Sequence, residues 1–120
     1  MRLIWLTLAV WAMFRVEPAH AQEHREYVRV TYYTIRGPMA SGIFTHKGAA
    51  ACSYGYPMGS VLEFEDGWAV TCLDRGLLGR DTGWVDVWAE SLAWGRRYVA
   101  QDYGNYAWVT VRCWGYCPAE

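Results

Sequence analysis

Asp86 is the residue of this sequence whose surroundings best suit acid–base chemistry. It lies in the run Trp84-Val85-Asp86-Val87-Trp88, which is typical of a β-strand. Because side chains alternate along a strand, Asp86 shares one face with both tryptophans and opposes both valines. A carboxyl between two indoles is partly desolvated, which raises its pKa, and it lies beside two rings on which a sugar can stack. The pattern predicts a general acid and base at Asp86.

Asp74 is the second candidate, because it follows a strand-like run and precedes Arg75 and Gly76. If it lies within a few ångströms of Asp86, its charge raises the pKa of one of the two carboxyls further. We therefore expect Asp74 to be the electrostatic partner of a catalytic Asp86. A purely structural role is the alternative for both, since an Asp at a turn commonly accepts hydrogen bonds from backbone N–H groups.

Three other polar residues are interpreted as structural. Asp66 precedes Gly67 between two strand-like runs, which favours a turn residue over a third catalytic acid. His46 is expected to be a solvated loop residue. Ser53 has no His and Asp pattern nearby and is not expected to be a nucleophile.

The aromatic residues divide into two expected groups. Tyr33, Trp84, Trp88 and Trp94 are candidates for stacking against a sugar. Trp68 and Trp108 begin apolar runs and are expected in the core, which in a domain with 3 Phe must use Trp and Tyr as large apolar residues.

The composition excludes several classes of protein. The 120 residues allow one domain, and a hydrophobic fraction of 53% with 8 Trp and 9 Tyr excludes a disordered chain. A net charge of −1 gives no electrostatic basis for binding nucleic acid. No glycine-rich nucleotide-binding loop occurs in the sequence. We expect a monomer that uses no cofactor and no metal.

The first 21 residues are expected to be a cleaved signal peptide. Arg2 supplies the positive charge, and the apolar run from Leu3 to Phe14 is shorter than the about 20 residues that span a bilayer. Ala19-His20-Ala21 fits a cleavage site. The prediction is a secreted or periplasmic cell-envelope protein whose single domain covers residues 22–120, without a stable membrane anchor. An uncleaved anchor is the alternative.

Four cysteines allow two disulfides, which a secreted chain can form. We favour Cys52–Cys72 and Cys113–Cys117 among the three possible connectivities. The alternative is a zinc site made of all four cysteines, although the usual spacing of two residues between ligands is absent.

Short runs of β-branched and aromatic residues alternate with turn residues, which predicts a small all-β barrel or sandwich. The expected strands cover residues 27–33, 49–52, 60–64, 68–73, 84–88 and 108–113. Asp66-Gly67 predicts a hairpin turn. A short helix is expected from Glu90 to about Gly95.

The order of several motifs resembles the rare lipoprotein A (RlpA) family of double-psi β-barrels and the related 3D (three-Asp) domain of membrane-bound lytic transglycosylase A. The similar segments cover most of residues 28–111. They are Tyr32-Tyr33, Ala40-Ser41-Gly42, Ala51-Cys52-Ser53, Pro57-Met58-Gly59-Ser60, Val70-Thr71-Cys72-Leu73-Asp74-Arg75-Gly76 and Val85-Asp86-Val87-Trp88.

The resemblance implies a small six-stranded double-psi β-barrel with one or two short helices, stapled by disulfides. It also implies action on cell-wall glycans, with Asp74 and Asp86 matching acidic positions of the 3D domain and Asp66 matching loosely. Lytic transglycosylases of this kind cleave peptidoglycan without water. Expansins and family-45 endoglucanases share the barrel and act on plant polysaccharide.

Two further functions stay open beside a lytic transglycosylase. Ser53 stands where RlpA-type enzymes have a catalytic His, and no acidic residue occurs between Gly37 and Gly48. These departures favour a non-catalytic, expansin-like module that binds peptidoglycan or another polysaccharide. The third possibility is a secreted interaction domain that has kept the barrel and lost the groove.

Overall fold

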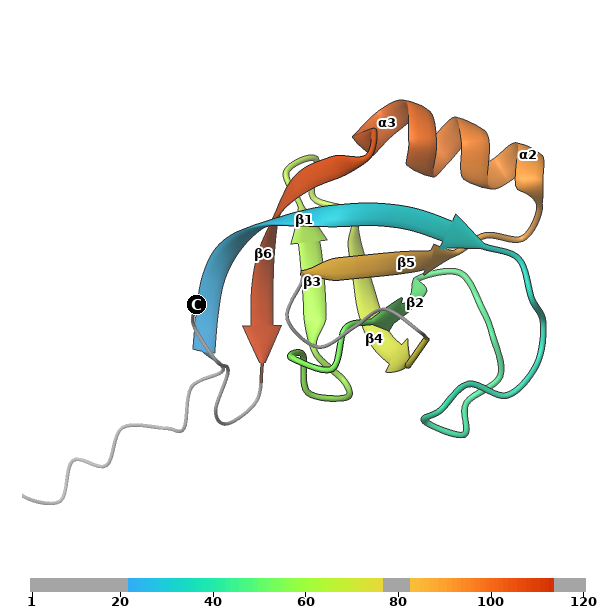
Figure 1. Ribbon diagram of the computed structural model, residues 1–120, viewed down its shortest axis with the longest axis horizontal. Helices are drawn as coiled ribbons and strands as arrows, with labels where there is room; N and C mark the ends of the chain where they lie inside the picture. The colour runs from blue at the N-terminus through green and yellow to red at the C-terminus, as the bar shows by residue number, and fades with distance from the viewer. Residues whose placement is uncertain (1–21, 77–82, 114–120) are drawn as a thin grey trace, which may run out of the picture.

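The computed structural model describes residues 22–76 and 83–113 (Figure 1). The expected signal peptide, residues 1–21, lies outside the described residues. So does Cys117, and with it the expected Cys113–Cys117 disulfide. Among the described residues, no helix has the length and apolar character needed to cross a membrane.

Six strands and one continuous helical segment make up the described chain. The strands are β1 (Gln22–Tyr33), β2 (Ala49–Cys52), β3 (Val61–Phe64), β4 (Ala69–Asp74), β5 (Trp84–Trp88) and β6 (Tyr106–Cys113). The helical segment consists of α2 (Leu92–Gly95), a π-helical stretch η1 (Arg96–Ala100) and α3 (Gln101–Tyr103).

The strands close into a barrel in the order β1-β5-β2-β4-β3-β6, which confirms the expected six-stranded barrel. Two neighbouring pairs, β1–β5 and β2–β4, are parallel, and the other four pairs are antiparallel. Parallel neighbours need long crossover connections, so strands far apart in the sequence lie side by side (Figure 1). This mixed topology brings the ends of β4 and β5 close to the loop of residues 34–48.

Period-two alternation explains the core of the barrel. Every second residue of β5 and β6 points inward, and these are mostly valines: Val85, Val87, Val109 and Val111, all buried. β-branched side chains suit such strands because they pack well on a pleated surface. The residues between them point outward, which fixes the face on which Asp86 lies.

The expected strand 60–64 and the strand that returns from it form the β3–β4 hairpin, with the turn at Asp66-Gly67 as expected. Gly67 has a φ of 92°, a conformation that favours glycine. Asp66 Oδ1 accepts a hydrogen bond from the Trp68 backbone N–H at 3.0 Å. β1 is longer than expected, because residues 22–26 also pair with β6.

The helix does not end near Gly95, so that prediction was wrong. Ser91 caps its start by accepting a hydrogen bond from the Trp94 N–H at 3.0 Å, and the helical segment ends at Gly104, whose φ is 68°. Gly95 lies where the helix touches β1, since a Cβ on it would be 2.2 Å from the Tyr32 ring. The glycine permits close packing against the barrel and does not terminate the helix.

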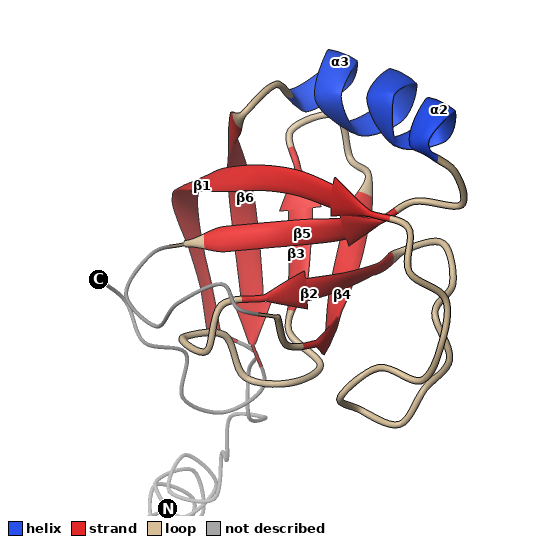
Figure 2. Ribbon diagram, turned by 45° about the vertical axis from the view of Figure 1, so that its right-hand side comes forward, coloured by secondary structure: helices blue, strands red, loops and turns tan. Residues whose placement is uncertain are grey.

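The helix covers one side of the barrel, and the loop of residues 34–48 projects from another (Figure 2). Val99 on the helix is buried in the main core together with Val28, Leu62 and Phe64. The helix thus completes the core, while the loop stands beside the ends of β4 and β5.

Cys52 and Cys72 form a disulfide between β2 and β4, as expected. Because these two sulfurs are bonded to each other, they are not available as thiolate ligands, and the alternative zinc site made of four cysteines does not form. Within residues 22–76 and 83–113, no group of three or more His, Cys, Asp or Glu side chains could hold a metal ion.

Candidate active site

Asp86 and Asp74 lie on opposite sides of one alanine. In the strand register, Ala51 of β2 pairs with Asp86 of β5 on one side and with Asp74 of β4 on the other. The two aspartates are therefore two strand spacings apart, about 10 Å between backbones. The small side chain of Ala51 leaves the space between the two carboxyls open.

That space is a pocket of about 250 Å³ that both carboxyls line. Its other walls come from the end of β1, the 34–48 loop and the residues after β4. The lining residues include Tyr33, Ile35, Pro38, Thr45, Ala51, Asp74, Arg75 and Asp86. The barrel topology thus brings Asp74 and Asp86 to the walls of one pocket.

Three donors orient Asp74. Its Oδ1 accepts hydrogen bonds from the backbone N–H groups of Ala40 and Arg75, both at 2.9 Å. Its Oδ2 accepts the Tyr33 hydroxyl at 3.3 Å. The 34–48 loop is also tied to β4 by the Ser41 N–H, which donates to the Leu73 carbonyl at 3.0 Å. Asp74 therefore holds the turn, as the structural alternative expected, and it also lines the pocket.

Asp86 is held by a short relay on the outer face of the barrel. The Thr31 hydroxyl donates to Asp86 Oδ1 at 2.7 Å, and the indole Nε1–H of Trp84 donates to the same hydroxyl at 2.8 Å. Thr31 and Asp86 are neighbours because they pair in the parallel β1–β5 register. The relay fixes the orientation of the carboxyl.

The pKa of Asp86 is raised above its ordinary value of 3.8. Burial is the main cause, the Thr31 hydrogen bond opposes it, and the negative charge of Asp74 adds to the increase. A raised pKa keeps more of the carboxyl protonated, which is what a general acid requires.

Tyr33 is the third polar group of the pocket. Burial, followed by the charge of Asp74, raises the pKa of its hydroxyl, so the phenol stays protonated and donates to Asp74. Tyr33 was expected as a surface for stacking a sugar. The structure places it at the wall of the pocket, with its hydroxyl directed at Asp74.

The three tryptophans expected beside the acids lie in different places. Trp84 lies on the outer face with its ring stacked under the Arg29 guanidinium at 4.1 Å. Trp88 is buried with Met39 and Ala49, and its indole N–H donates to the Ile35 carbonyl at 3.0 Å. Thus Trp84 is partly exposed near Asp86, while Trp88 packs beneath the 34–48 loop.

Trp94 is not brought to the pocket. It lies on the helix, packs against the main core and contacts Trp68 with ring centroids 6.2 Å apart. The expected core position of Trp68 agrees with its packing, whereas Trp108 points outward from β6 and is exposed. Alternation explains this, because Val109 and Val111 take the inward positions of that strand.

The residues expected to be structural stay outside the pocket. Asp66 accepts the Tyr103 hydroxyl at 2.7 Å besides its turn hydrogen bond. His46 is exposed on the loop, with its Nδ1 3.0 Å from the Phe44 carbonyl oxygen. Ser53 is buried, and its hydroxyl bonds to the backbone of Trp84.

Two site residues were missed from the sequence. Thr31 lies two positions before Tyr33, so strand alternation could have placed both on the face of Asp86. Arg75 lines the pocket, and its guanidinium donates to the carbonyls of Cys52, Ser53 and Tyr56. Those partners are backbone atoms of a distant turn, which no side-chain pattern reveals.

Searches of protein-family models, of curated proteins and of solved structures found no match to this chain. Its function is therefore argued from the residues and the pocket themselves.

Proposed function

We propose that this chain is a secreted or periplasmic protein that acts on cell-wall glycans and cleaves peptidoglycan as a lytic transglycosylase. The observation that carries the proposal is the pocket shared by Asp86 and Asp74, in which burial and the neighbouring charge raise the pKa of Asp86. The motif resemblance to rare lipoprotein A and 3D domains supports the choice of peptidoglycan.

In the proposed reaction, protonated Asp86 gives its proton to the glycosidic oxygen as the bond from that oxygen to the sugar C1 breaks. The 6-hydroxyl of the same sugar then attacks C1, and its proton returns to Asp86. The product is a 1,6-anhydro sugar, and no water is consumed. A single carboxyl suffices because it acts first as the acid and then as the base.

Asp74 has an electrostatic part in this reaction. Its negative charge raises the pKa of Asp86 before the reaction, and it stabilises positive charge that develops at C1. The Ala40 and Arg75 backbone donors and Tyr33 keep its carboxyl in place. Thr31 is a positioning residue, since it acts through Asp86.

The alternative function is a non-catalytic module that binds peptidoglycan or another polysaccharide, in the manner of expansins. Ser53 favours it, because the motif resemblance matches this residue to the RlpA-type His, and in the structure it is buried and bonds to backbone atoms. It therefore offers no acid or base to the pocket.

Product analysis separates these functions. The purified protein, with disulfides intact, is incubated with peptidoglycan sacculi, and the soluble products are examined by mass spectrometry for 1,6-anhydro-muropeptides. We expect such products from the parent protein and none from Asp86→Asn. Glu90→Gln is the matched control, because Glu90 is an exposed carboxylate outside the pocket, paired with Lys47 at 3.6 Å.

Co-sedimentation with sacculi completes the test. Retained binding without anhydro products would overturn the enzymatic proposal and support the binding module. Loss of both binding and products would overturn the proposal of glycan action altogether. Anhydro products that persist in Asp86→Asn would remove Asp86 from the role of acid.

A further inference from the structure

Three aromatic side chains form a platform on the outer face of β1 and β6, away from the Asp74–Asp86 pocket. Tyr27 stacks on Tyr106 with ring centroids 5.5 Å apart and contacts Trp108 at 5.4 Å. Their exposed fractions are 59%, 52% and 46%, so about half of the surface of each residue faces solvent. A contiguous patch of exposed aromatic side chains often marks an interaction site, so the platform is a candidate binding surface.

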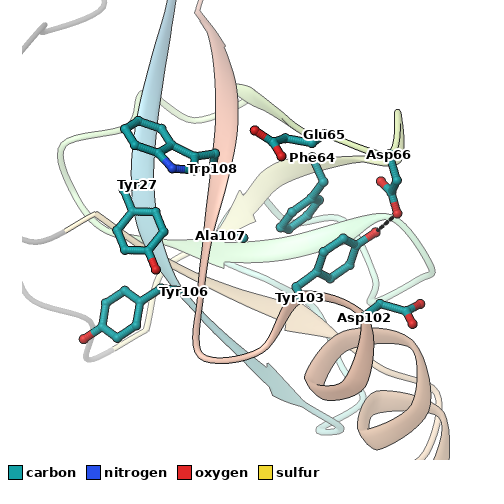
Figure 3. Close-up of a pocket in the computed structure, with 9 residues that line it drawn as sticks. All are labelled: Tyr27, Phe64, Glu65, Asp66, Asp102, Tyr103, Tyr106, Ala107 and Trp108. Atoms are coloured by element: carbon teal, nitrogen blue, oxygen red, sulfur yellow. Dashed lines mark hydrogen bonds between the residues drawn. The ribbon is translucent and has the colours of Figure 1, made fainter.

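A groove of about 350 Å³ runs beside this platform. It exists because β6 pairs with β3 only from Val109 onward, so residues 106–108 leave one strand edge open. Figure 3 shows the aromatic platform on one side of the groove and the carboxylates of Glu65, Asp66 and Asp102 on the other.

The charges of the groove nearly cancel. Glu65 pairs with Arg25 at 2.5 Å, Asp102 pairs with Arg97 at 2.8 Å, and Asp66 accepts the Tyr103 hydroxyl. The carboxylates of the groove are therefore already paired and are not free to bind a strongly cationic partner. Aromatic faces beside carboxylates and guanidinium groups instead suit a saccharide, whose C–H face packs on rings and whose hydroxyls bond to charged groups.

The outward side chains of β1 connect this platform to Asp86. Arg29 pairs with Tyr106 of β6 on one side and with Trp84 of β5 on the other. Trp84 then donates to Thr31, which donates to Asp86. From Tyr27 to Tyr33 the outward face of β1 extends about 20 Å. That is the length of a short oligosaccharide and exceeds that of a single sugar.

We infer that the outward face of β1, with Tyr27, Tyr106 and Trp108 at its far end, is a track that binds a saccharide chain and leads it to Asp86. The identity of the saccharide as a peptidoglycan strand rests on the proposed function. The track itself rests on the platform, the groove and the continuous row of side chains along β1.

The test measures binding in the Asp86→Asn background, where no turnover is expected. Calorimetry with soluble peptidoglycan glycan strands of graded length gives the affinity as a function of length. We expect longer strands to bind more tightly. Tyr106→Ala and Trp108→Ala should each weaken the affinity for long strands about 2- to 10-fold. The shortest strands, which reach only the pocket, should bind equally to both variants.

Phe44→Ala is the matched control, because Phe44 is a 62% exposed aromatic residue that lines neither the pocket nor the groove. Circular dichroism confirms that each variant is folded. Unchanged affinity for long strands in both platform variants would overturn the track. Dimerisation through the platform would also overturn the track. It would be seen as a molecular mass that rises with protein concentration in the parent and stays monomeric in Tyr106→Ala.

The outcomes separate the track from the proposed function. Length-dependent binding that depends on the platform, without anhydro products from the parent protein, would support the track and contradict the enzyme. Anhydro products from the parent, together with an affinity for long strands that the platform substitutions do not change, would support the enzyme and contradict the track.

Discussion

Replacing Thr31 by valine removes the hydroxyl that joins Trp84 to Asp86 while keeping nearly the same volume. Two hydrogen bonds are lost, one of 2.7 Å to the carboxyl and one of 2.8 Å from the indole. At neutral pH we expect the hydrogen bond to the charged carboxyl to contribute about 1.5 kcal/mol to the free energy of unfolding. This is at the low end of the usual contribution of such bonds, because the site is partly exposed. The hydrogen bond from the indole should contribute about 0.5 kcal/mol. The free energy of unfolding should therefore fall by about 2 kcal/mol.

The loss should depend on pH. The Thr31 hydrogen bond lowers the pKa of Asp86, so the valine variant has an even higher pKa at that carboxyl. A hydrogen bond that favours the ionised form stabilises the fold above the pKa and loses this advantage below it. Below the ordinary value of 3.8, the difference should shrink to about 1 kcal/mol, which is the contribution of two neutral hydrogen bonds.

Urea unfolding of the parent, Thr31→Val and Thr31→Ser at neutral and acidic pH measures both effects. Thr31→Ser keeps the hydroxyl and should restore most of the stability at neutral pH. A valine variant as stable as the parent, or one that loses the same free energy at both pH values, would refute the relay as described.

Other substitutions test the packing and the electrostatics. Gly95→Ala should lower the free energy of unfolding by about 1–2 kcal/mol, because the clash with Tyr32 outweighs the higher helix propensity of alanine; a stabilised variant would contradict the close contact. Replacing both Cys52 and Cys72 by serine should cost about 3 kcal/mol in urea unfolding, since their sequence separation is 20, and no loss would contradict a stabilising disulfide. Asp86→Asn should stabilise the fold at neutral pH, because burial raises the pKa of the native carboxyl. This gain should vanish below pH 3.8, and a gain that persists there would exclude ionisation as its cause.

Local patterns predicted the strands well, because alternation and turn residues act over a few positions. The strand 84–88, the hairpin turn at Asp66-Gly67 and the disulfide Cys52–Cys72 follow from such patterns. The end of the helix did not follow, since a glycine looks the same in the sequence whether it ends a helix or packs against a ring. Only the contact with Tyr32 distinguishes the two at Gly95.

The candidate site was predictable only in part. Motif order and alternation identified Asp74 and Asp86, but the parallel β1–β5 pairing that brings Thr31 to Asp86 joins positions 55 residues apart. The same long-range topology decides that Trp88 is buried and that Trp94 lies on the helix. A list of tryptophans cannot reveal which of them faces a pocket.

Asp74 and Asp86 share a pocket, and burial there together with the charge of Asp74 favours the protonated form of Asp86. The most direct measurement is a carboxyl titration of Asp86 by nuclear magnetic resonance, in the parent protein and in Asp74→Asn. We predict a pKa above 3.8 in the parent, which falls when the Asp74 charge is removed. A pKa at or below 3.8 in the parent, or one that does not respond to Asp74→Asn, would contradict the claim.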